Sequence, residues 1–242
     1  MVFNIIKIRK SYDRFLSRRD WLHSMHSFSF AEHRDPKWDN FGNIRVINED
    51  IISPNSGFNM HSHSDMEIIT VVTKGAITHR DSLNNSGKIY ENEVQVMSAG
   101  TGITHSEKNE ENKPCKLFQI WIYPKKSNLK PDYKQTSFKN GIGENLIIDY
   151  LDSKNKLLIN QDISIWRCRY KPIKEKKLPL KIDKYNWIQI IEGNLLLKSK
   201  DSNSNIYLEY GDGLGFEVNY YDDVSIDTKK ELDFLLFSMP SL

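Results

Sequence analysis

Short runs of β-branched and aromatic residues follow one another along the chain, with turn-forming residues between them. In the first half these runs are residues 44–48, 67–73, 76–79, 94–97 and 117–123, and clusters of Gly, Asn, Asp and Ser separate them. Runs of this length and composition are typical of β-strands. No long apolar repeat with the period of a helix is visible. The sequence therefore predicts an all-β sandwich or barrel.

A break in this pattern divides the 242 residues into two parts. The stretch from Pro124 to Phe138 has two prolines, several lysines and few apolar residues, which is typical of a connector. Strand-like runs then resume at 145–150, 156–160, 164–170, 187–193, 194–198 and 234–238. The run 67–75 resembles 187–193, since each ends in a polar residue followed by glycine. We expect two tandem barrels, residues 1–130 and 131–242, with one large sandwich as the alternative.

The histidines are distributed unevenly, because all seven lie within the first 105 residues. If both halves are barrels, only the first can offer imidazoles to a metal. Two pairs stand out, His61-Ser62-His63 and His105-Ser106-Glu107. On a strand, residues two apart point to the same face, so two strands of one barrel would bring both pairs around one ion. The spacing therefore predicts one mononuclear metal site.

Three neutral imidazoles and a carboxylate suit Fe(II), Mn(II), Co(II), Ni(II), Cu(II) or Zn(II). Four protein ligands leave two positions of an octahedral site for water, substrate or dioxygen, whereas structural zinc sites are more often closed and rich in thiolate. Glu67 is an alternative carboxylate, because strand parity also allows it on the face of His61 and His63. From the residues alone the choice between Glu67 and Glu107 stays open.

The remaining histidines carry no comparable pattern. We expect His26 to be structural and hydrogen-bonded near the barrel entrance, and His79 to be exposed at a polar turn. His23 and His33 belong to no constellation. A further set of apolar side chains could line a dry cavity that suits a flat aromatic ligand: Phe28, Phe30, Phe58, Met60, Met97, Phe118 and Trp121.

The glycines around the histidine pairs complete two motifs that resemble those of the cupins. The first is Gly57-x3-His61-x-His63-x3-Glu67-x7-Gly75, and the second is Gly100-x-Gly102-x2-His105-x3-Asn109. The first Gly-to-His spacing is shorter than is usual in cupins, and Gly100 stands where cupins often have proline. The resemblance implies antiparallel barrels of the jelly-roll type, with the histidines as metal ligands.

Within the cupins, the segments 21–31, 61–67, 97–107 and 119–124 resemble the pirin family, and such matches run in order from about residue 17 to 138. The second half is similar in outline, including Gly211-Asp212-Gly213 and the closing run 235–240. Pirins are bicupins with metal in the N-terminal barrel only, which agrees with the distribution of histidines. The resemblance places the ligands at His61, His63, His105 and Glu107, with Glu67 outside the ligand set.

The same resemblance implies an activity. Some pirin-like proteins are quercetin 2,3-dioxygenases, and we expect this metal-dependent chemistry on a flavonol or a similar enol-containing aromatic, with Fe(II) as the metal, O2 as co-substrate and Glu107 as general base. The alternative is a non-enzymatic regulator that binds a protein partner according to the redox state of its iron. A metal-free storage or scaffold cupin is a third possibility.

Composition excludes several other classes. The net charge of +2, from 34 basic and 32 acidic residues, predicts neither nucleic acid nor a membrane as the main partner. No segment approaches the roughly 20 apolar residues of a membrane span, and no secretory signal is visible. Two isolated cysteines, Cys115 and Cys168, suit a reducing compartment as buried thiols. We expect a cytoplasmic monomer, since tandem barrels can satisfy each other internally.

Overall fold

The computed structural model describes residues 3–138, 141–150, 157–199, 205–218 and 224–241. It divides into two compact units. The first barrel consists of Phe15–Lys139 and Tyr150–Gln161, and the second barrel of Met1–Arg14, Asn140–Asp149 and Asp162–Leu242. These units do not coincide with the continuous segments 1–130 and 131–242 that the sequence suggested.

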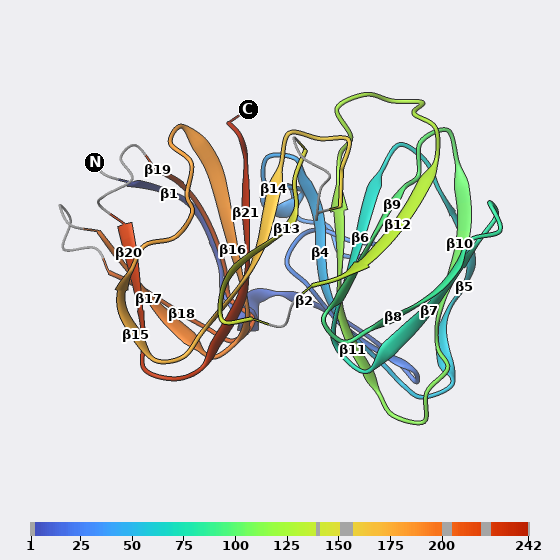
Figure 1. Cartoon of the computed structure of the whole chain (residues 1–242), viewed down its shortest axis with the longest axis horizontal. Helices are drawn as coiled ribbons and strands as arrows, with labels where there is room; N and C mark the ends of the chain where they lie inside the picture. The colour runs from blue at the N-terminus through green and yellow to red at the C-terminus, as the bar shows by residue number, and fades with distance from the viewer. Residues whose placement is uncertain (1–2, 139–140, 151–156, 200–204, 219–223, 242) are drawn as a thin grey trace. The chain divides into compact units, whose positions relative to one another are not determined.

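The first barrel pairs a seven-stranded sheet with a four-stranded one (Figure 1). The strand order in the larger sheet is β12-β9-β6-β11-β4-β3-β2, and in the smaller sheet β5-β10-β7-β8. A 3₁₀ turn, η2 (Pro36–Trp38), follows β3. The strands are β2 (Phe15–Arg19), β3 (Leu22–His26), β4 (Ile44–Ile52), β5 (Ser56–His63), β6 (Glu67–Lys74), β7 (Ala76–Asp81), β8 (Ser86–Tyr90), β9 (Glu93–Ser98), β10 (Ile103–Asn109), β11 (Cys115–Ile122) and β12 (Asp132–Ser137).

The second barrel repeats this topology with a six-stranded sheet, β1-β19-β16-β21-β14-β13, and a four-stranded sheet, β15-β20-β17-β18. A 3₁₀ turn, η1 (Ser11–Asp13), follows β1. The strands are β1 (Phe3–Arg9), β13 (Gly143–Ile148), β14 (Ser164–Tyr170), β15 (Ile173–Lys176), β16 (Lys184–Glu192), β17 (Asn194–Ser199), β18 (Ile206–Glu209), β19 (Gly213–Val218), β20 (Val224–Thr228) and β21 (Leu232–Pro240).

The repeat between the two halves is confirmed at the level of single turns. β6 leads through Gly75 into β7, and β16 leads through Gly193 into β17, with φ angles of +79° and +81° at the two glycines. Both glycines adopt the left-handed conformation that side chains disfavour. The paired strands run antiparallel in both barrels, as expected for the jelly-roll type.

Two segments differ from the expectations. Part of the expected connector 124–138 forms β12, which pairs with β9 at the edge of the larger sheet, so the sheet extends past residue 130. A strand was expected at 156–160, but residues 157–160 belong to none of the strands β1–β21. Residue 156 lies outside the described part of the chain. Residues 150–161 instead belong to the first barrel.

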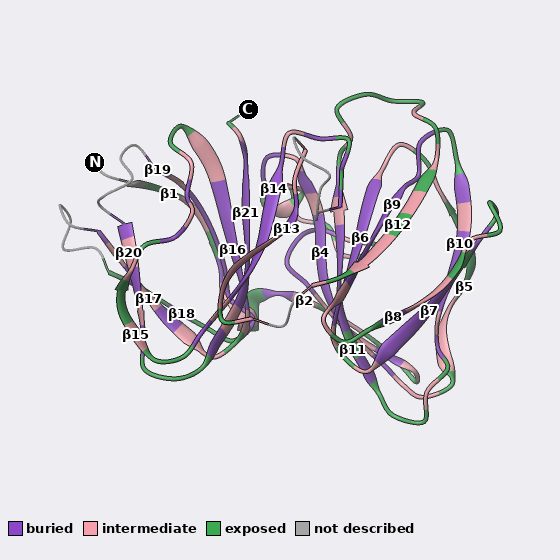
Figure 2. Cartoon of the chain, in the orientation of Figure 1, coloured by how far each residue is buried: buried purple, intermediate pink, exposed green. Residues whose placement is uncertain are grey.

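The cores lie between the paired sheets, and the central strands β6 and β11 are largely buried (Figure 2). In the second barrel, one continuous cluster that includes Leu197, Phe216, Ile226 and Phe234 fills the interior. Cys115 and Cys168 are buried free thiols, as the sequence predicted. Within the described residues, no helix has the length and apolar composition needed to cross a bilayer.

Candidate metal centre

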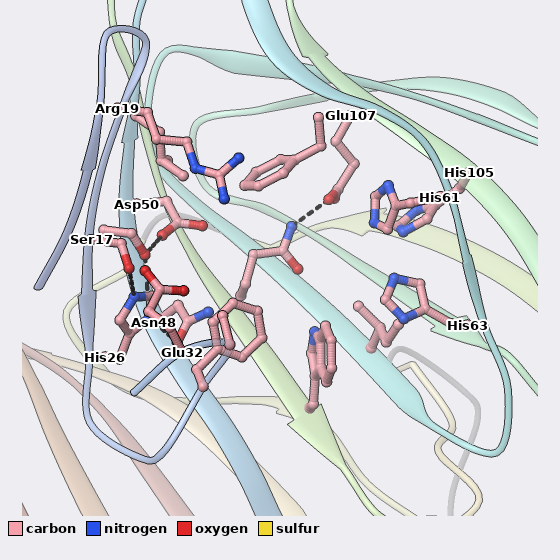
Figure 3. Close-up of a pocket in the computed structure, with 18 residues that line it drawn as sticks. Ser17, Arg19, His26, Glu32, Asn48, Asp50, His61, His63, His105 and Glu107 are labelled. Carbon is pink, nitrogen blue, oxygen red and sulfur yellow. Dashed lines mark hydrogen bonds between the residues drawn. The ribbon is translucent and has the colours of Figure 1, made fainter. Parts of the chain in front are cut away.

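Two neighbouring strands of the four-stranded sheet carry the predicted ligands. β5 and β10 pair antiparallel, so that His105 lies opposite His61 and Ile103 lies opposite His63. The side chains of His61, His63 and His105 gather at one end of a cavity in the first barrel, as the i, i+2 spacing required (Figure 3).

A bulge between these strands sets the direction of the side chains. His105 pairs with His61 and Glu107 with Phe58, so two steps along β10 match three steps along β5. On a regular strand Phe58 and His61 would point to opposite faces, whereas here both line the cavity. Gly57 makes the close approach possible, because a Cβ on it would lie 2.2 Å from the backbone oxygen of Glu107.

The three imidazoles form a compact cluster. Their ring centroids are 4.4 Å (His61–His105), 4.8 Å (His61–His63) and 5.0 Å (His63–His105) apart, and one ring nitrogen from each lies within 4.8 Å of the others. Burial, followed by the neighbouring imidazoles, lowers the pKa of His63 to about 4 and that of His105 to about 3. These rings are therefore neutral near pH 7 and offer lone pairs to a cation.

The hydrogen bonds show which nitrogens are free to bind a metal. His61 Nδ1 donates to the backbone oxygen of Asn59 at 2.7 Å, which leaves the lone pair on its Nε2. Among the described residues, the buried His105 Nε2 has no hydrogen-bond partner. A buried polar nitrogen without a partner is costly unless a ligand satisfies it. The donor set and this orphaned nitrogen therefore fit a divalent metal ion.

Glu107 lies beside this cluster and not within it. Its carboxylate groups with His79 and His105, at distances up to 4.8 Å, and not with His61 and His63. Thr70 Oγ1 donates to Glu107 Oε1 at 3.1 Å, and Gln119 Nε2 donates to Oε2 at 2.6 Å. Thr70 and Gln119 face each other on β6 and β11, so the larger sheet holds the carboxylate of a residue on the smaller one.

His79 lies beside the cluster although the sequence analysis did not place it there. It was expected to be exposed at a turn, but it is fully buried in β7, where it pairs with Glu107 of β10. Its Nδ1 lies 3.4 Å from His105 Nδ1, and its Nε2 lies 3.1 Å from Asp81 Oδ2. The sequence feature that could have identified it is a third i, i+2 pair, His79 and Asp81, whose side chains point inward like those of the other two pairs.

This arrangement fixes the orientation of the His105 ring. The carboxylate of Asp81 can only accept, so His79 donates to it from Nε2, which makes its Nδ1 available to accept from His105. His105 then donates from Nδ1, which places its lone pair on Nε2. Burial alone would raise the pKa of Asp81, but hydrogen bonds from Asn85 and His79 and from two backbone amides hold it below its usual value.

Glu67 lies outside both groups of side chains that could hold a metal ion. It accepts hydrogen bonds from Ser98 Oγ at 2.6 Å and from the backbone and side chain of Asn160 at 3.2 Å. The parity argument for Glu67 was wrong, because a turn with Asp65 at φ +48° separates β5 from β6 and resets the alternation. Glu67 and Asn160 line a different cavity of the same barrel.

The cavity beside the imidazoles has a volume of about 210 Å³. Of the expected apolar lining, Phe30, Phe58 and Trp121 contribute to its walls. Trp121 contacts the ring of His63 edge-on, with centroids 4.9 Å apart. The others do not line it: Phe28, Met97 and Phe118 are core residues, and Met60 is 56% exposed.

His26 is buried in the cavity wall and is hydrogen-bonded, as expected for a structural residue. It lies 2.8 Å from Asn48 Oδ1 and 2.8 Å from Ser17 Oγ. His33 stacks on Phe15 at 5.3 Å. His23 and His33 belong to neither group of side chains that could hold a metal ion.

Comparison with known proteins decides the family. The sequence profile of the family Pirin matches residues 8–122, and the profile described as the quercetinase C-terminal cupin domain matches residues 146–239. The chain is 34% identical over 239 residues to quercetin 2,3-dioxygenase of Escherichia coli K12, covering 98% of this chain and 99% of that protein. The chain belongs to the pirin family.

Two further relatives agree with this pirin assignment. A pirin-like protein of Caulobacter vibrioides is 50% identical over 135 residues, which is 55% of this chain and 58% of that protein. The crystal structure of a bacterial pirin from Escherichia coli in complex with nickel(II) is 33% identical, covers 98% of this chain and 99% of that one, and superposes with a TM-score of 0.87. The expected bicupin architecture is thereby confirmed.

Proposed function

We propose that this pirin is a metal-dependent dioxygenase that cleaves a flavonol, or a similar enol-containing aromatic, in the manner of a quercetin 2,3-dioxygenase. The observation that carries the proposal is the cluster of His61, His63 and His105, with its orphaned nitrogen, at the end of a cavity flanked by aromatic side chains. The name of the Escherichia coli relative supports the reaction class.

The residues that would hold the metal are His61, His63, His105 and Glu107. We propose Fe(II) as the bound ion, with Ni(II), Co(II), Mn(II), Cu(II) and Zn(II) as alternatives that the same donors accept. When bound, the metal lowers the pKa of a coordinated hydroxyl and brings it together with dioxygen.

The protein side chains supply orientation, water exclusion and a proton acceptor. Phe30, Phe58 and Trp121 flank a flat ring and limit access of water. Glu107, held by Thr70 and Gln119, accepts the proton of the substrate's 3-hydroxyl on a carboxylate oxygen. In the overall reaction both atoms of O2 enter the ring-opened product, and the carbon that carried the 3-hydroxyl leaves as carbon monoxide.

The test is an aerobic assay with quercetin on protein loaded separately with iron, nickel and copper. We expect loss of the flavonol absorbance with release of one carbon monoxide per quercetin, and loss of at least 100-fold in turnover in Glu107→Gln. Glu110→Gln, on an exposed carboxylate of the same barrel, is the matched control. Undiminished turnover in metal-replete Glu107→Gln would remove its role as base.

Failure with every metal would reject the dioxygenase. A redox-dependent capture of a protein partner by the iron-loaded chain would then support the regulator, which uses the same four residues.

A further inference from the structure

The cavity has a second polar wall, opposite the imidazoles (Figure 3). It is built by β2, β3 and β4 of the larger sheet, while the imidazoles come from β5 and β10 of the smaller sheet. Its polar members are Ser17, Arg19, Ser24, His26, Asn48 and Asp50. The pairing of the strands aligns them, because Ser24 lies opposite Asp50 and His26 opposite Asn48.

Hydrogen bonds within this wall involve only some of its donor and acceptor atoms. Ser24 donates to Asp50 Oδ1, and His26 donates from Nδ1 to Asn48 Oδ1 while its Nε2 is hydrogen-bonded to Ser17 Oγ. Within the described part of the chain, Asp50 Oδ2 and Asn48 Nδ2 have no protein partner. Gln119, next to Asn48 in the sheet, uses its amide nitrogen for Glu107 and has no such partner at Oε1.

These three side chains are buried, with 1% exposure for Asp50, 4% for Asn48 and 6% for Gln119. A core that needed only stability would fill such positions with apolar residues, as β4 does at Val46 and Ile52 on the same face. The polar atoms of Asp50, Asn48 and Gln119 face the cavity, where a ligand or water can complete their hydrogen bonds. The wall is therefore built to receive polar atoms from the cavity.

We propose that Asp50, Asn48 and Gln119 form a subsite that recognises the hydroxyl groups of an aromatic ring whose other end is held at the imidazole cluster. A hydroxyl both donates and accepts, so it can pair with the Asp50 carboxyl whether or not that group carries a proton. It can also pair with the acceptor Gln119 Oε1 and the donor Asn48 Nδ2. The substrate class is thus a flat, polyhydroxylated aromatic. The inference rests on the proposed function, since it assumes that the imidazole end holds the substrate's enol.

The geometry of the barrel supports a ligand that spans both walls. Side chains of both walls line the same cavity, so one bound ligand can contact both. Between the walls, Phe30, Phe58 and Ile68 offer apolar surface to ring faces. Such a site discriminates strongly against an analogue without hydroxyls, because its own polar atoms would then stay unpaired.

The test compares quercetin with 3-hydroxyflavone, which keeps the 3-hydroxyl and 4-oxo groups but has no hydroxyl on its outer rings. Zinc-loaded protein, which cannot change redox state, is titrated anaerobically with each ligand, and the shift of the ligand's absorption band gives its Kd. We expect wild type to bind quercetin at least tenfold more tightly than 3-hydroxyflavone.

Asp50→Val should remove most of this preference by weakening quercetin binding alone, while zinc content stays at the wild-type value. Asp50→Asn, which keeps the shape and the hydrogen bond with Ser24, should show an intermediate preference and guards against misfolding of the valine variant. Asp132→Val, on an exposed carboxylate outside this cavity, is the matched control and should leave the preference unchanged.

Equal affinity of wild type for the two ligands, or a preference that survives in both Asp50 variants, would overturn the subsite and leave a wall that binds water only. The proposed function fails separately: a hydroxyl preference lost in Asp50→Val, without oxygen-dependent turnover in the aerobic assay, keeps the subsite and rejects the dioxygenase. Absence of binding of both ligands would reject both proposals.

Discussion

His79 ties the candidate ligand His105 to a turn of the backbone. Asp81 accepts hydrogen bonds from the backbone amides of Leu83 and Asn85 as well as from His79, so the turn after β7 fixes the imidazole behind the ligand. Partners of this kind hold the ring orientation of metal-binding histidines, and their loss typically weakens metal binding 10- to 100-fold.

We therefore predict that His79→Leu raises the Kd for Co(II) about 10- to 100-fold and shifts the visible spectrum of the cobalt-loaded protein. The reason is that His105 loses the acceptor that keeps its lone pair on Nε2. His23→Leu, on β3 and outside the cavity lining, is the control. An unchanged affinity and spectrum in His79→Leu would show that His105 needs no such support.

Asp50 makes the stability of the chain depend on pH. Burial raises its pKa to about 7, against the hydrogen bond from Ser24 that lowers it, and the charges of Glu107 and Glu49 raise it further. The folded chain keeps a proton that the unfolded chain loses above about pH 4, so the free energy of unfolding falls as pH rises from about 4 to 7.

Asp50→Asn removes this ionisation. We predict that its free energy of unfolding exceeds that of wild type by about 2–4 kcal/mol more at pH 8 than at pH 4.5. Urea unfolding of both proteins at the two pH values measures the difference. A gap between the two proteins that does not change with pH would refute the assigned proton.

The spacing of residues predicted the direction of their side chains where both members of a pair lie on one strand. The pairs on β5 and β10 kept their faces, so the gathering of His61, His63 and His105 followed from their spacing. The same inference failed for Glu67, because the turn before β6 breaks the alternation. The support by Thr70 and Gln119 was not predictable, since it depends on how two sheets face each other. Assignment of Glu107 as a ligand stays a prediction.

At the scale of elements, the bulge between β5 and β10 connects backbone conformation to the site. Gly57 has φ +145°, and an added Cβ would collide with the backbone of Glu107 and Lys108. Gly102, just before β10, has a similar φ of +141° but no atom within 4 Å of the added Cβ. Substitution of Gly102 therefore causes backbone strain alone, whereas substitution of Gly57 causes the same strain and a steric collision.

We predict that Gly57→Ala lowers the free energy of unfolding by about 1–3 kcal/mol more than Gly102→Ala and reduces the metal content of the purified protein. The physical reason is that β5 must shift away from β10, which moves His61 relative to His105. Denaturant unfolding and elemental analysis of both variants provide the measurements. Equal losses in the two variants would mean that the bulge does not hold the site.

Elements with alternating or fully apolar composition were predictable, and polar edge elements were not. β6 and β11 are central, buried strands whose β-branched and aromatic residues identify them. β12 is an edge strand with polar, partly exposed side chains, so its composition resembled that of a connector. The apolar run at 157–160 instead brings Asn160 to Glu67, a role that no local pattern indicates.

At the scale of the whole molecule, the two barrels share a strand order but differ in what their interiors hold. By their place in the sheets, β15 and β20 correspond to β5 and β10, yet they carry no histidine. The apolar cluster of the second barrel occupies its interior instead. The expectation of twin barrels followed from a repeat along the sequence. The sequence did not predict that β1 belongs to the second barrel, because pairing between strands more than 200 residues apart produces no local sequence pattern.

We propose that one metal ion binds per chain, at His61, His63, His105 and Glu107. Elemental analysis of the purified chain, after loading with Fe(II) or Ni(II) and removal of free metal, tests it most directly. We predict one equivalent per chain in wild type and in His23→Leu, and less than about 0.1 equivalent in His63→Ala. Retention of a full equivalent by His63→Ala, or two equivalents in wild type, would contradict the account.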